Sequence, residues 1–440
     1  MARGKKKESL TPEECLQAAL VPESEQPYQV PTNWCWTRIG DILRLQAGKN
    51  ISASKISKSR SQEASFPCFG GNGVRGYVER YNYDGEFPII GRQGALCGNV
   101  NWASGKFYAT EHAVVVECSS NISKRWAYHI LFSMNLNQYA TATAQPGLSV
   151  AVINQVPIAL PPAPEQQRIV ERIESLFSKL DEAKQKAQDA LDSFETRKAA
   201  ILHKAFTGEL TAHWRKDHGV GMESWKKSRF DEVATIKSNL VNPLDFPDLP
   251  HIAPDNIEKK TGVLLEYHTV SEDGVTSGKH RFYPGQILYS KIRPYLSKVV
   301  VVDFDGLCSA DMYPIEAEGN VKCLWYYMLS EEFLEQASSA GSRSVLPKIN
   351  QKELSALTVV LPTLKDEQEE IIRILDDMFA KEQQAKESTE RVLEQIDLIK
   401  KAILARAFRG ELGTNDPSEE SAVELLKQAL KEDKREVFRV

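Results

Sequence analysis

The sequence lacks the features that would place it in a membrane, in a secreted disulfide scaffold or around a structural metal. No apolar run approaches the length of a bilayer-spanning helix, and no apolar stretch follows the basic start at residues 1–7 to make a secretory signal. The seven cysteines are odd in number and scattered, with no C-x-x-C pair and no histidine at zinc-finger spacing. We therefore expect a cytoplasmic protein with reduced thiols, no structural metal and no membrane contact.

Signatures of catalysis are also missing. Segment 274–280 imitates a phosphate-binding loop, but its glycines stand one residue too close and His280 replaces the expected Ser or Thr. Segment 242–245 (Asn-Pro-Leu-Asp) lacks the second proline and the aromatic residue of the Asn-Pro-Pro-aromatic motif of adenine methyltransferases. No cofactor-binding glycine loop follows a strand and opens a helix. We expect the chain by itself to be non-catalytic and to bind no cofactor.

The net charge of −5 over 440 residues argues weakly against nucleic-acid binding, but the charge is unevenly distributed. Residues 34–160 carry twelve Lys and Arg against seven Asp and Glu, a net charge of +5. Residues 225–361 carry fifteen against eighteen, a net charge of −3. If the second region binds a polyanion, it must therefore use a local basic patch.

An internal repeat is the strongest feature of the sequence. The segments at 165–170 (Glu-Gln-Gln-Arg-Ile-Val) and 198–210 (ending Ala-Phe-Thr-Gly-Glu-Leu) return at 367–372 and 400–412, with the same offset of 202 residues. An Ile-Asn-Gln segment followed by Leu-Pro precedes both copies. A duplicated module in one chain predicts a pseudo-two-fold protein, which suits a palindrome-like or bipartite target.

Each copy contains a heptad pattern over about forty residues, which predicts a helix roughly 60 Å long. Prolines precede the first helix, and Gly208 and Gly410 mark the two ends. Glu382 and Thr389 interrupt the second seam. A two-helix core or a homodimer zipper would show the same heptads, but two similar seams in one chain favour antiparallel pairing within it. The residues predicted to pair the helices are Ile169, Ile173, Leu176, Leu180, Ile371, Leu375, Met378, Val392 and Ile396.

The first globular region is rich in short aromatic or β-branched runs broken by glycine, which predict strands and tight turns. Two of its glycine-rich loops carry arginines, whose guanidinium groups match guanine or phosphate. A plain turn is the simpler reading of either loop alone, whereas two such loops in a basic region favour DNA binding. The residues predicted to contact DNA here are Gly73, Arg75, Tyr77 and Arg92.

The second globular region contains a basic and aromatic cluster at 282–299, the local patch that its net charge requires. The tyrosines there fit a core position as well as a DNA contact, whereas Lys291 and Arg293 favour function. A loop at 342–348 is a further candidate. The residues predicted to contact DNA in this region are Tyr289, Ser290, Lys291, Arg293, Tyr295, Lys298, Arg343 and Lys348.

These motifs resemble a known family. Leu-Pro-x(3)-Glu-Gln-x(2)-Ile opening a long helix, Ala-Phe-x-Gly-Glu-Leu closing it and the segment 285–296 are similar to the specificity (S) subunits of type I restriction-modification systems, over roughly residues 31–412. The resemblance implies that each target-recognition domain reads half of a bipartite site in double-stranded DNA. It implies that the helices set the half-site spacing and dock two modification (M) subunits. S-adenosylmethionine, ATP and Mg would act on the partner M and restriction (R) subunits, which methylate adenine N6, translocate and cleave.

We accordingly predict an α+β chain with two strand-rich, mixed α/β target-recognition domains in a pseudo-two-fold arrangement, joined by two long antiparallel coiled-coil helices. The predicted segments are an N-terminal extension (1–30), target-recognition domain 1 (31–163), a central coiled-coil helix (164–210), a linker (211–224), target-recognition domain 2 (225–363), a distal coiled-coil helix (364–412) and a tail with a short amphipathic helix (413–440).

Two other functions compete with DNA reading. A coiled-coil scaffold that assembles other proteins without DNA specificity would share the helices. A methyltransferase or nuclease in its own right is disfavoured by the missing motifs. Duplex binding that weakens steeply with salt would separate the DNA reader from the scaffold, because counterion release accompanies phosphate contacts.

Overall fold

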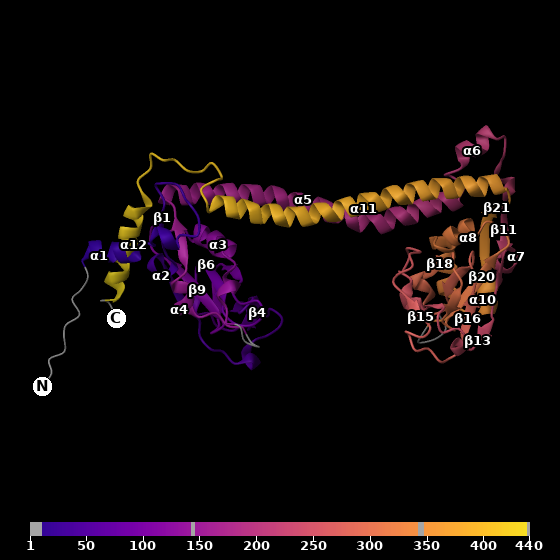
Figure 1. The fold of residues 1–440 in the computed structure, drawn as a ribbon, viewed down its shortest axis with the longest axis horizontal. Helices are drawn as coiled ribbons and strands as arrows, with labels where there is room; N and C mark the ends of the chain where they lie inside the picture. The colour runs from indigo at the N-terminus through magenta and orange to yellow at the C-terminus, as the bar shows by residue number, and fades with distance from the viewer. Residues whose placement is uncertain (1–10, 142–145, 342–346, 438–440) are drawn as a thin grey trace. The chain divides into compact units, whose positions relative to one another are not determined.

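The computed structural model describes residues 11–141, 146–341 and 347–437 (Figure 1). The chain forms two compact units. Unit 1 comprises Met1–Lys186 together with Val392–Val440, and unit 2 comprises Ala187–Arg391. The two longest helices, α5 (Ala163–Phe206) and α11 (Lys365–Ala407), each contribute one segment to either unit. The predicted combination of two long helices with strand-rich domains is confirmed.

The helix ends follow from local sequence. Pro161 and Pro162 precede α5, and Ala163 and Pro164 form its first turn, where a missing backbone N–H costs nothing. Both long helices stop two or three residues before a glycine in the left-handed region, Gly208 at φ +81° and Gly410 at φ +75°. A residue with a Cβ is disfavoured in that conformation, so glycine ends the helix there.

Within each unit the segments of α5 and α11 run antiparallel, as predicted. In unit 1 the Lys184 ammonium lies 3.0 Å from the Asp397 carboxylate, and Lys400 pairs with Asp181, so positions advance along one helix as they recede along the other. In unit 2 Arg197 makes a two-pronged contact with Glu382, at 2.9 Å for the shortest pair. Glu382, which interrupts the heptad seam, is therefore half-buried against a guanidinium.

The predicted pairing residues differ widely in burial. Those nearest the helix starts enter the cores of the globular domains, and among those further along only Ile396 is fully buried. Fully buried are Ile169, Ile173, Ile371, Leu375 and Ile396; half-buried are Leu176, Leu180 and Met378. Val392 remains 43% exposed, so the structure does not bury it at a seam. Ile169 and Ile173 pack with the core of unit 1, and Ile371 and Leu375 pack with the core of unit 2, so the start of each helix is fixed to a globular domain.

Unit 1 contains a short antiparallel pair and two four-stranded sheets. The pair joins β1 (Cys35–Arg38) and β10 (Pro157–Leu160). The first sheet has the order β2 (Leu43–Ala47), β9 (Ala113–Cys118), β6 (Phe87–Gly91) and β7 (Val100–Ala103). The second has the order β4 (Gly73–Val78), β3 (Phe66–Gly70), β8 (Lys106–Ala109) and β5 (Tyr83–Asp84), with β3 and β8 parallel.

Unit 2 contains a corresponding pair and two corresponding sheets. The pair joins β11 (Trp225–Arg229) and β21 (Thr358–Pro362). The first sheet has the order β12 (Ala234–Ile236), β20 (Met312–Ala317), β17 (Ile287–Ser290) and β18 (Val299–Val301). The second has the order β13 (Leu240–Val241), β16 (Lys279–Phe282), β19 (Gly306–Cys308), β14 (Pro250–Ile252) and β15 (His268–Thr269), with β14 and β19 parallel.

The units therefore share their strand connections, and the duplication read from the helices extends through the globular domains. The four-stranded sheets correspond strand for strand, and each second sheet has a parallel pair between antiparallel neighbours, although the sheet of unit 2 has one more strand. The shorter helices of unit 1 are α2 (Ile39–Ile42), α3 (Lys124–Ser133) and α4 (Val150–Asn154). Those of unit 2 are α6 (Ala212–Asp217), α7 (Phe230–Val233), α8 (Val321–Met328), α9 (Glu331–Ala340) and α10 (Gln351–Ser355).

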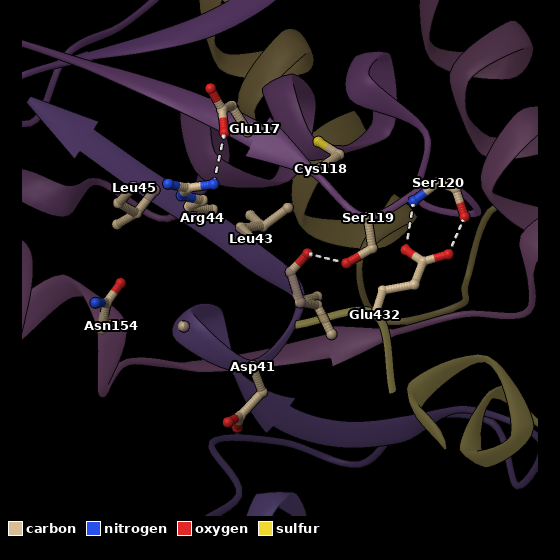
Figure 2. Close-up of a pocket in the computed structure, with 12 residues that line it drawn as sticks. Asp41, Leu43, Arg44, Leu45, Glu117, Cys118, Ser119, Ser120, Asn154 and Glu432 are labelled. Atoms are coloured by element: carbon tan, nitrogen blue, oxygen red, sulfur yellow. Dashed lines mark hydrogen bonds and ion pairs between the residues drawn. The ribbon is translucent and has the colours of Figure 1, made fainter. Parts of the chain in front are cut away.

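Unit 1 carries two further helices, α1 (Pro12–Ala19) and α12 (Ala422–Val437), from the N-terminal extension and the tail. The apolar face of α12 enters the core of unit 1 through Ala422, Leu425, Leu426 and Ala429. Figure 2 shows Glu432 of α12 accepting hydrogen bonds from the backbone and hydroxyl of Ser120. The Thr37 hydroxyl donates to the Ala19 carbonyl, so the end of α1 lies against β1, which is buried, while β11 of unit 2 is largely exposed.

None of the helices in the described part of the chain combines the length and the apolar composition that crossing a bilayer requires.

Candidate nucleic-acid interface

The same loop geometry recurs at one end of the four-stranded sheet in both units. In unit 1, β6 ends at Gly91, and the Arg92 N–H then donates to the His112 carbonyl at 3.0 Å. In unit 2, β17 ends at Ser290, and the Lys291 N–H donates to the Asp311 carbonyl at 2.9 Å. Arg92 and Lys291 therefore occupy equivalent positions just beyond a central strand.

A second segment crosses each of these strand ends. The Arg92 carbonyl accepts from the Leu148 N–H at 2.8 Å, and the Gly94 N–H donates to the Pro146 carbonyl at 3.0 Å. These bonds define the unit 1 loop cluster, residues 91–94 with 146–149. A backbone that leaves a sheet must find new hydrogen-bond partners, and the crossing segment supplies them.

The unit 2 loop cluster, residues 290–298 with 347–350, repeats this pattern. The Lys291 carbonyl accepts from the Ile349 N–H at 2.9 Å, and the Arg293 N–H donates to the Pro347 carbonyl at 2.8 Å. Isolated bridges between Gln93 and Gly147 and between Ile292 and Lys348 complete the correspondence. The predicted residues Arg92, Lys291, Arg293 and Lys348 thus fall into one duplicated structure.

Each cluster borders a shallow hollow that contains both polar and apolar residues. The hollow in unit 1 is lined by Arg92, Glu111, His112, Thr141, Gly147 and Ser149. The hollow in unit 2 is lined by Lys291, Tyr313, Gly341, Lys348, Asn350 and Glu353. In both units, side chains that can donate to phosphate or to base edges face an open surface.

Asp311 organises the cations of the unit 2 cluster. Its carboxylate lies 3.1 Å from the Lys348 ammonium and 3.9 Å from that of Lys291. Lys291 also donates to the Ala310 carbonyl and lies 5.4 Å above the Tyr313 ring. Glu353 of the same hollow supplies a second carboxylate, and the exposed Arg293 supplies a third cation. Three cations against two carboxylates leave a small positive excess, so this part of an otherwise acidic region is locally basic.

Arg293 sits on a turn with an unusual backbone. Arg293 at φ +48° and Ser297 at φ +45° flank the 3-10 turn η7 (Pro294–Leu296). Two non-glycine residues in the left-handed region cost on the order of 1–3 kcal/mol each, so neighbouring structure must hold them. The turn projects the exposed side chains of Arg293 and Tyr295, the latter 47% exposed.

Two predicted contact residues of unit 2 are buried. Strand β17 is buried on both faces, since Leu288 enters one core cluster and Tyr289 another. Tyr289 is 1% exposed and packs edge-on against Phe333, and burial raises its pKa above the ordinary value. Ser290 is 2% exposed, and its hydroxyl donates to the Ile292 carbonyl. The predicted DNA contacts of Tyr289 and Ser290 are therefore wrong, because both side chains belong to the core.

Lys298 is also held by the protein. Its ammonium donates to the Pro254 carbonyl at 2.7 Å and lies 3.4 Å from the Asp255 carboxylate, and its side chain is 15% exposed. The Lys298 ammonium thus joins its loop to residues 254–255, and its predicted DNA contact stays a prediction. Arg343 lies outside the described residues, so its prediction stays untested.

In unit 1 the two glycine-rich loops lie against each other. A Cβ on Gly91 would stand 1.7 Å from the Gly71 carbonyl oxygen, and one on Gly71 would stand 2.5 Å from that of Gln93. Only glycine permits this approach, which brings the turn of the β3–β4 hairpin beside Arg92. Gly73 forms that turn at φ +79°, Arg75 is exposed on β4, and Tyr77 is half-buried.

A buried carboxylate anchors each domain to the long helices, and sequence reasoning missed its role. In unit 1 the Glu165 carboxylate is fully buried and accepts from the Trp34 indole at 2.7 Å, Thr414 at 3.2 Å and Asn415 at 2.8 Å. It thereby joins the start of the domain, the start of α5 and the segment beyond α11.

Glu367 does the same in unit 2. It is fully buried and accepts from the Trp225 indole at 3.0 Å, Thr211 at 2.9 Å, Ser224 at 3.2 Å and the Arg215 guanidinium at 2.8 Å. The repeated Glu-Gln pairs at 165–166 and 367–368, together with the repeated tryptophans, were the signal that could have identified these anchors.

No three side chains of the His, Cys, Asp or Glu types gather as a possible metal site in residues 11–141, 146–341 and 347–437.

Comparison with known proteins identifies the family. The model of the "Type I restriction modification DNA specificity domain" matches residues 31–191 and again 222–395. The chain is 33% identical over 407 residues to the type I restriction enzyme EcoDI specificity subunit of Escherichia coli, covering 87% of this chain and 90% of that protein. The EcoprrI specificity subunit of E. coli is 46% identical over 147 residues, covering 33% of this chain and 37% of that protein.

Solved structures support the same fold. A chain from a type I restriction-modification system studied for complex assembly and conformational transition has a TM-score of 0.64 at 18% identity, covering 88% of this chain and all of that one. The HsdS subunit of Thermoanaerobacter tengcongensis has a TM-score of 0.55 at 18% identity, with the same coverage. These comparisons do not favour the scaffold without DNA specificity. The chain therefore belongs to the type I restriction-modification DNA specificity family, and its role is the recognition of DNA sequence.

Proposed function

We propose that each unit reads one half of a bipartite site in double-stranded DNA through its loop cluster. The observation that carries this proposal is the duplicated geometry beyond β6 and β17, with a cation at the same position in both units, Arg92 and Lys291. Arg92 and Arg75 supply guanidinium groups in unit 1, and Arg293 does so in unit 2. A guanidinium can contact guanine through two hydrogen bonds, whereas Lys348 and Lys291 suit phosphate oxygens.

We further propose that α5 and α11 set the spacer between the half-sites and dock two methyltransferase (M) subunits. S-adenosylmethionine would bind to those subunits, and ATP and Mg to restriction (R) subunits, while this chain itself is non-catalytic. The names of the similar proteins, which are subunits of type I restriction enzymes, support this assembly.

Mapping methylated adenines in a host that expresses the system tests the half-site assignment. Arg293→Ala should loosen or abolish one half of the methylated motif and leave the other half defined, and Arg92→Ala should do the reverse. If either substitution damages both halves equally, the residue acts on the fold and not on its own half-site.

Binding of the full-length chain, purified with the subunits that accompany it, should also weaken steeply with salt. Neutralised phosphates release counterions, so the logarithm of the binding constant falls linearly with the logarithm of salt concentration. A complex that is insensitive to salt would contradict phosphate contacts by these loops.

A further inference from the structure

The turn that presents Arg293 is held by a second loop. The Lys260 N–H donates to the carbonyls of Leu296 at 3.1 Å and Ser297 at 3.3 Å, the last residues of the turn. The hydroxyl of Ser297 is buried and has no hydrogen-bond partner among the described residues. The strained turn therefore depends on backbone contacts from Lys260 at this end.

Lys260 lies at the tip of the 257–264 loop, and contacts at the base and at the tip hold the conformation of this loop. Its base is closed by a bridge between Ile257 and Leu264. At its tip, Lys260 and Gly262 adopt φ angles of +62° and +78°. A Cβ on Gly262 would stand 2.4 Å from the Trp325 ring, so the tip is pressed against α8. Lys260 in this conformation costs energy that an external contact must offset.

That contact comes from the long helix α5. The Lys198 ammonium donates to the carbonyls of Lys260 at 3.1 Å and Thr261 at 2.8 Å. It lies 5.4 Å above the ring of Phe379 on α11. A chain of direct contacts therefore runs from the paired helices through Lys198 and the 257–264 loop to the turn that carries Arg293.

The repeat supplies an internal comparison. Lys400 stands 202 positions after Lys198, and its ammonium lies 5.1 Å above Phe177, which stands 202 positions before Phe379. In unit 1, however, the ammonium of Lys400 pairs with Asp181 on α5. The lysine–phenylalanine pair thus occurs in both units, and in unit 2 its lysine also binds the carbonyls of a loop of the recognition domain.

We propose that Lys198 is a positioning residue for base selection by unit 2, which fixes the 257–264 loop and through it the backbone that presents Arg293 and Tyr295. This inference rests on the proposed function, in which unit 2 reads its own half-site. It also links the helices directly to one reading loop, so that displacement of α5 at Lys198 would alter sequence preference in that half.

The protonation of Lys198 allows a second test of the same contact. Burial lowers the pKa of its ammonium to about 8, although Glu258 of the loop and Glu195 of α5 oppose the shift. A group whose pKa is lowered by burial is held more favourably in its neutral form, so deprotonation favours the docked position of Lys198 against the loop. Selectivity in the unit 2 half should therefore strengthen as the pH rises from 7 to 9.

Selection of binding sites from a random duplex library by the full-length chain, with its accompanying subunits, tests the proposal. Lys198→Met should reduce discrimination against single-base changes in the unit 2 half-site by about tenfold and leave the unit 1 half-site unchanged. Lys400→Met, the matched control, should leave both half-sites as in the wild type. Arg293→Ala and Arg92→Ala identify which half belongs to which unit.

Measuring the pH dependence of base selection by the wild-type protein tests the proposal without relying on the folding of a variant. Discrimination by the wild-type protein in the unit 2 half should rise between pH 7 and 9, and Lys198→Met should remove this dependence. Unchanged discrimination in Lys198→Met, an equal effect of Lys400→Met, or a flat wild-type pH profile would overturn the role of Lys198. A wild-type protein that selects no bipartite site would instead overturn the proposed function.

Discussion

The buried anchors of the two units predict unequal responses to the same substitution. Glu367→Gln keeps the volume of the side chain but removes the charge that faces Arg215, which is 8% exposed and 2.8 Å away. A buried guanidinium without its carboxylate costs about 3–5 kcal/mol. Glu165→Gln removes a carboxylate whose hydrogen-bond donors, Trp34, Thr414 and Asn415, are neutral. Weakening such bonds costs about 1–2 kcal/mol.

Arg215→Met provides the control for this difference. It leaves Glu367 with the neutral donors Trp225, Thr211 and Ser224, which is the state that Glu165 already occupies in unit 1. The double variant with Glu367→Gln should therefore be more stable than the sum of the single effects predicts, by about 1–3 kcal/mol.

Hydrogen–deuterium exchange read by mass spectrometry measures the free energy of opening separately for peptides of each unit. Glu367→Gln should lower protection of β11, β21 and the start of α11, and leave β1 and β10 as in the wild type. Equal losses from Glu367→Gln and Glu165→Gln, or additive effects in the double variant, would refute the reasoning that the buried charge pair sets the difference.

Three further predictions follow from the geometry. A guanidinium that binds a guanine through two hydrogen bonds contributes about 1–3 kcal/mol of discrimination between bases. Arg293→Ala should therefore lose this discrimination at one position of one half-site, as measured by binding to single-base variants of the duplex. Inserting one heptad into both α5 and α11 adds about 10 Å and should lengthen the unread spacer by about three base pairs, whereas an unchanged methylation motif would contradict the helices as the ruler. The pKa of Lys198 is about 8 in the folded protein, against an ordinary value of 10.5. Between pH 8 and 10.5 the unfolded chain therefore keeps a proton on Lys198 that the folded protein has lost. The contribution of Lys198 to the free energy of unfolding should consequently rise with pH in this range. Lys198→Met should remove that rise in urea unfolding curves without lowering stability at pH 7.

The long helices and the duplication could be read from the sequence because both depend on local or repeated patterns. Heptad spacing and the glycines at 208 and 410 determine the conformation of residues only a few positions away. The repeat at an offset of 202 is found by comparing the sequence with itself. Arg92, Lys291 and Arg293 could be selected as candidates because cations beside turns are visible in sequence. Their grouping with residues 146–149 and 347–350 could not, because it depends on a crossing segment more than fifty residues away.

The sequence by itself thus determined the periodic elements, the repeat and the chemical types available for binding DNA. Only the tertiary structure decided which side chains face solvent. Tyr289 and Tyr295 are both tyrosines in one basic segment, yet one is 1% and the other 47% exposed, because β17 is covered on both faces while the next turn is not. Likewise, the partners of Glu367 and Lys198 are set by packing between distant segments, and long-range packing leaves no local trace in the sequence.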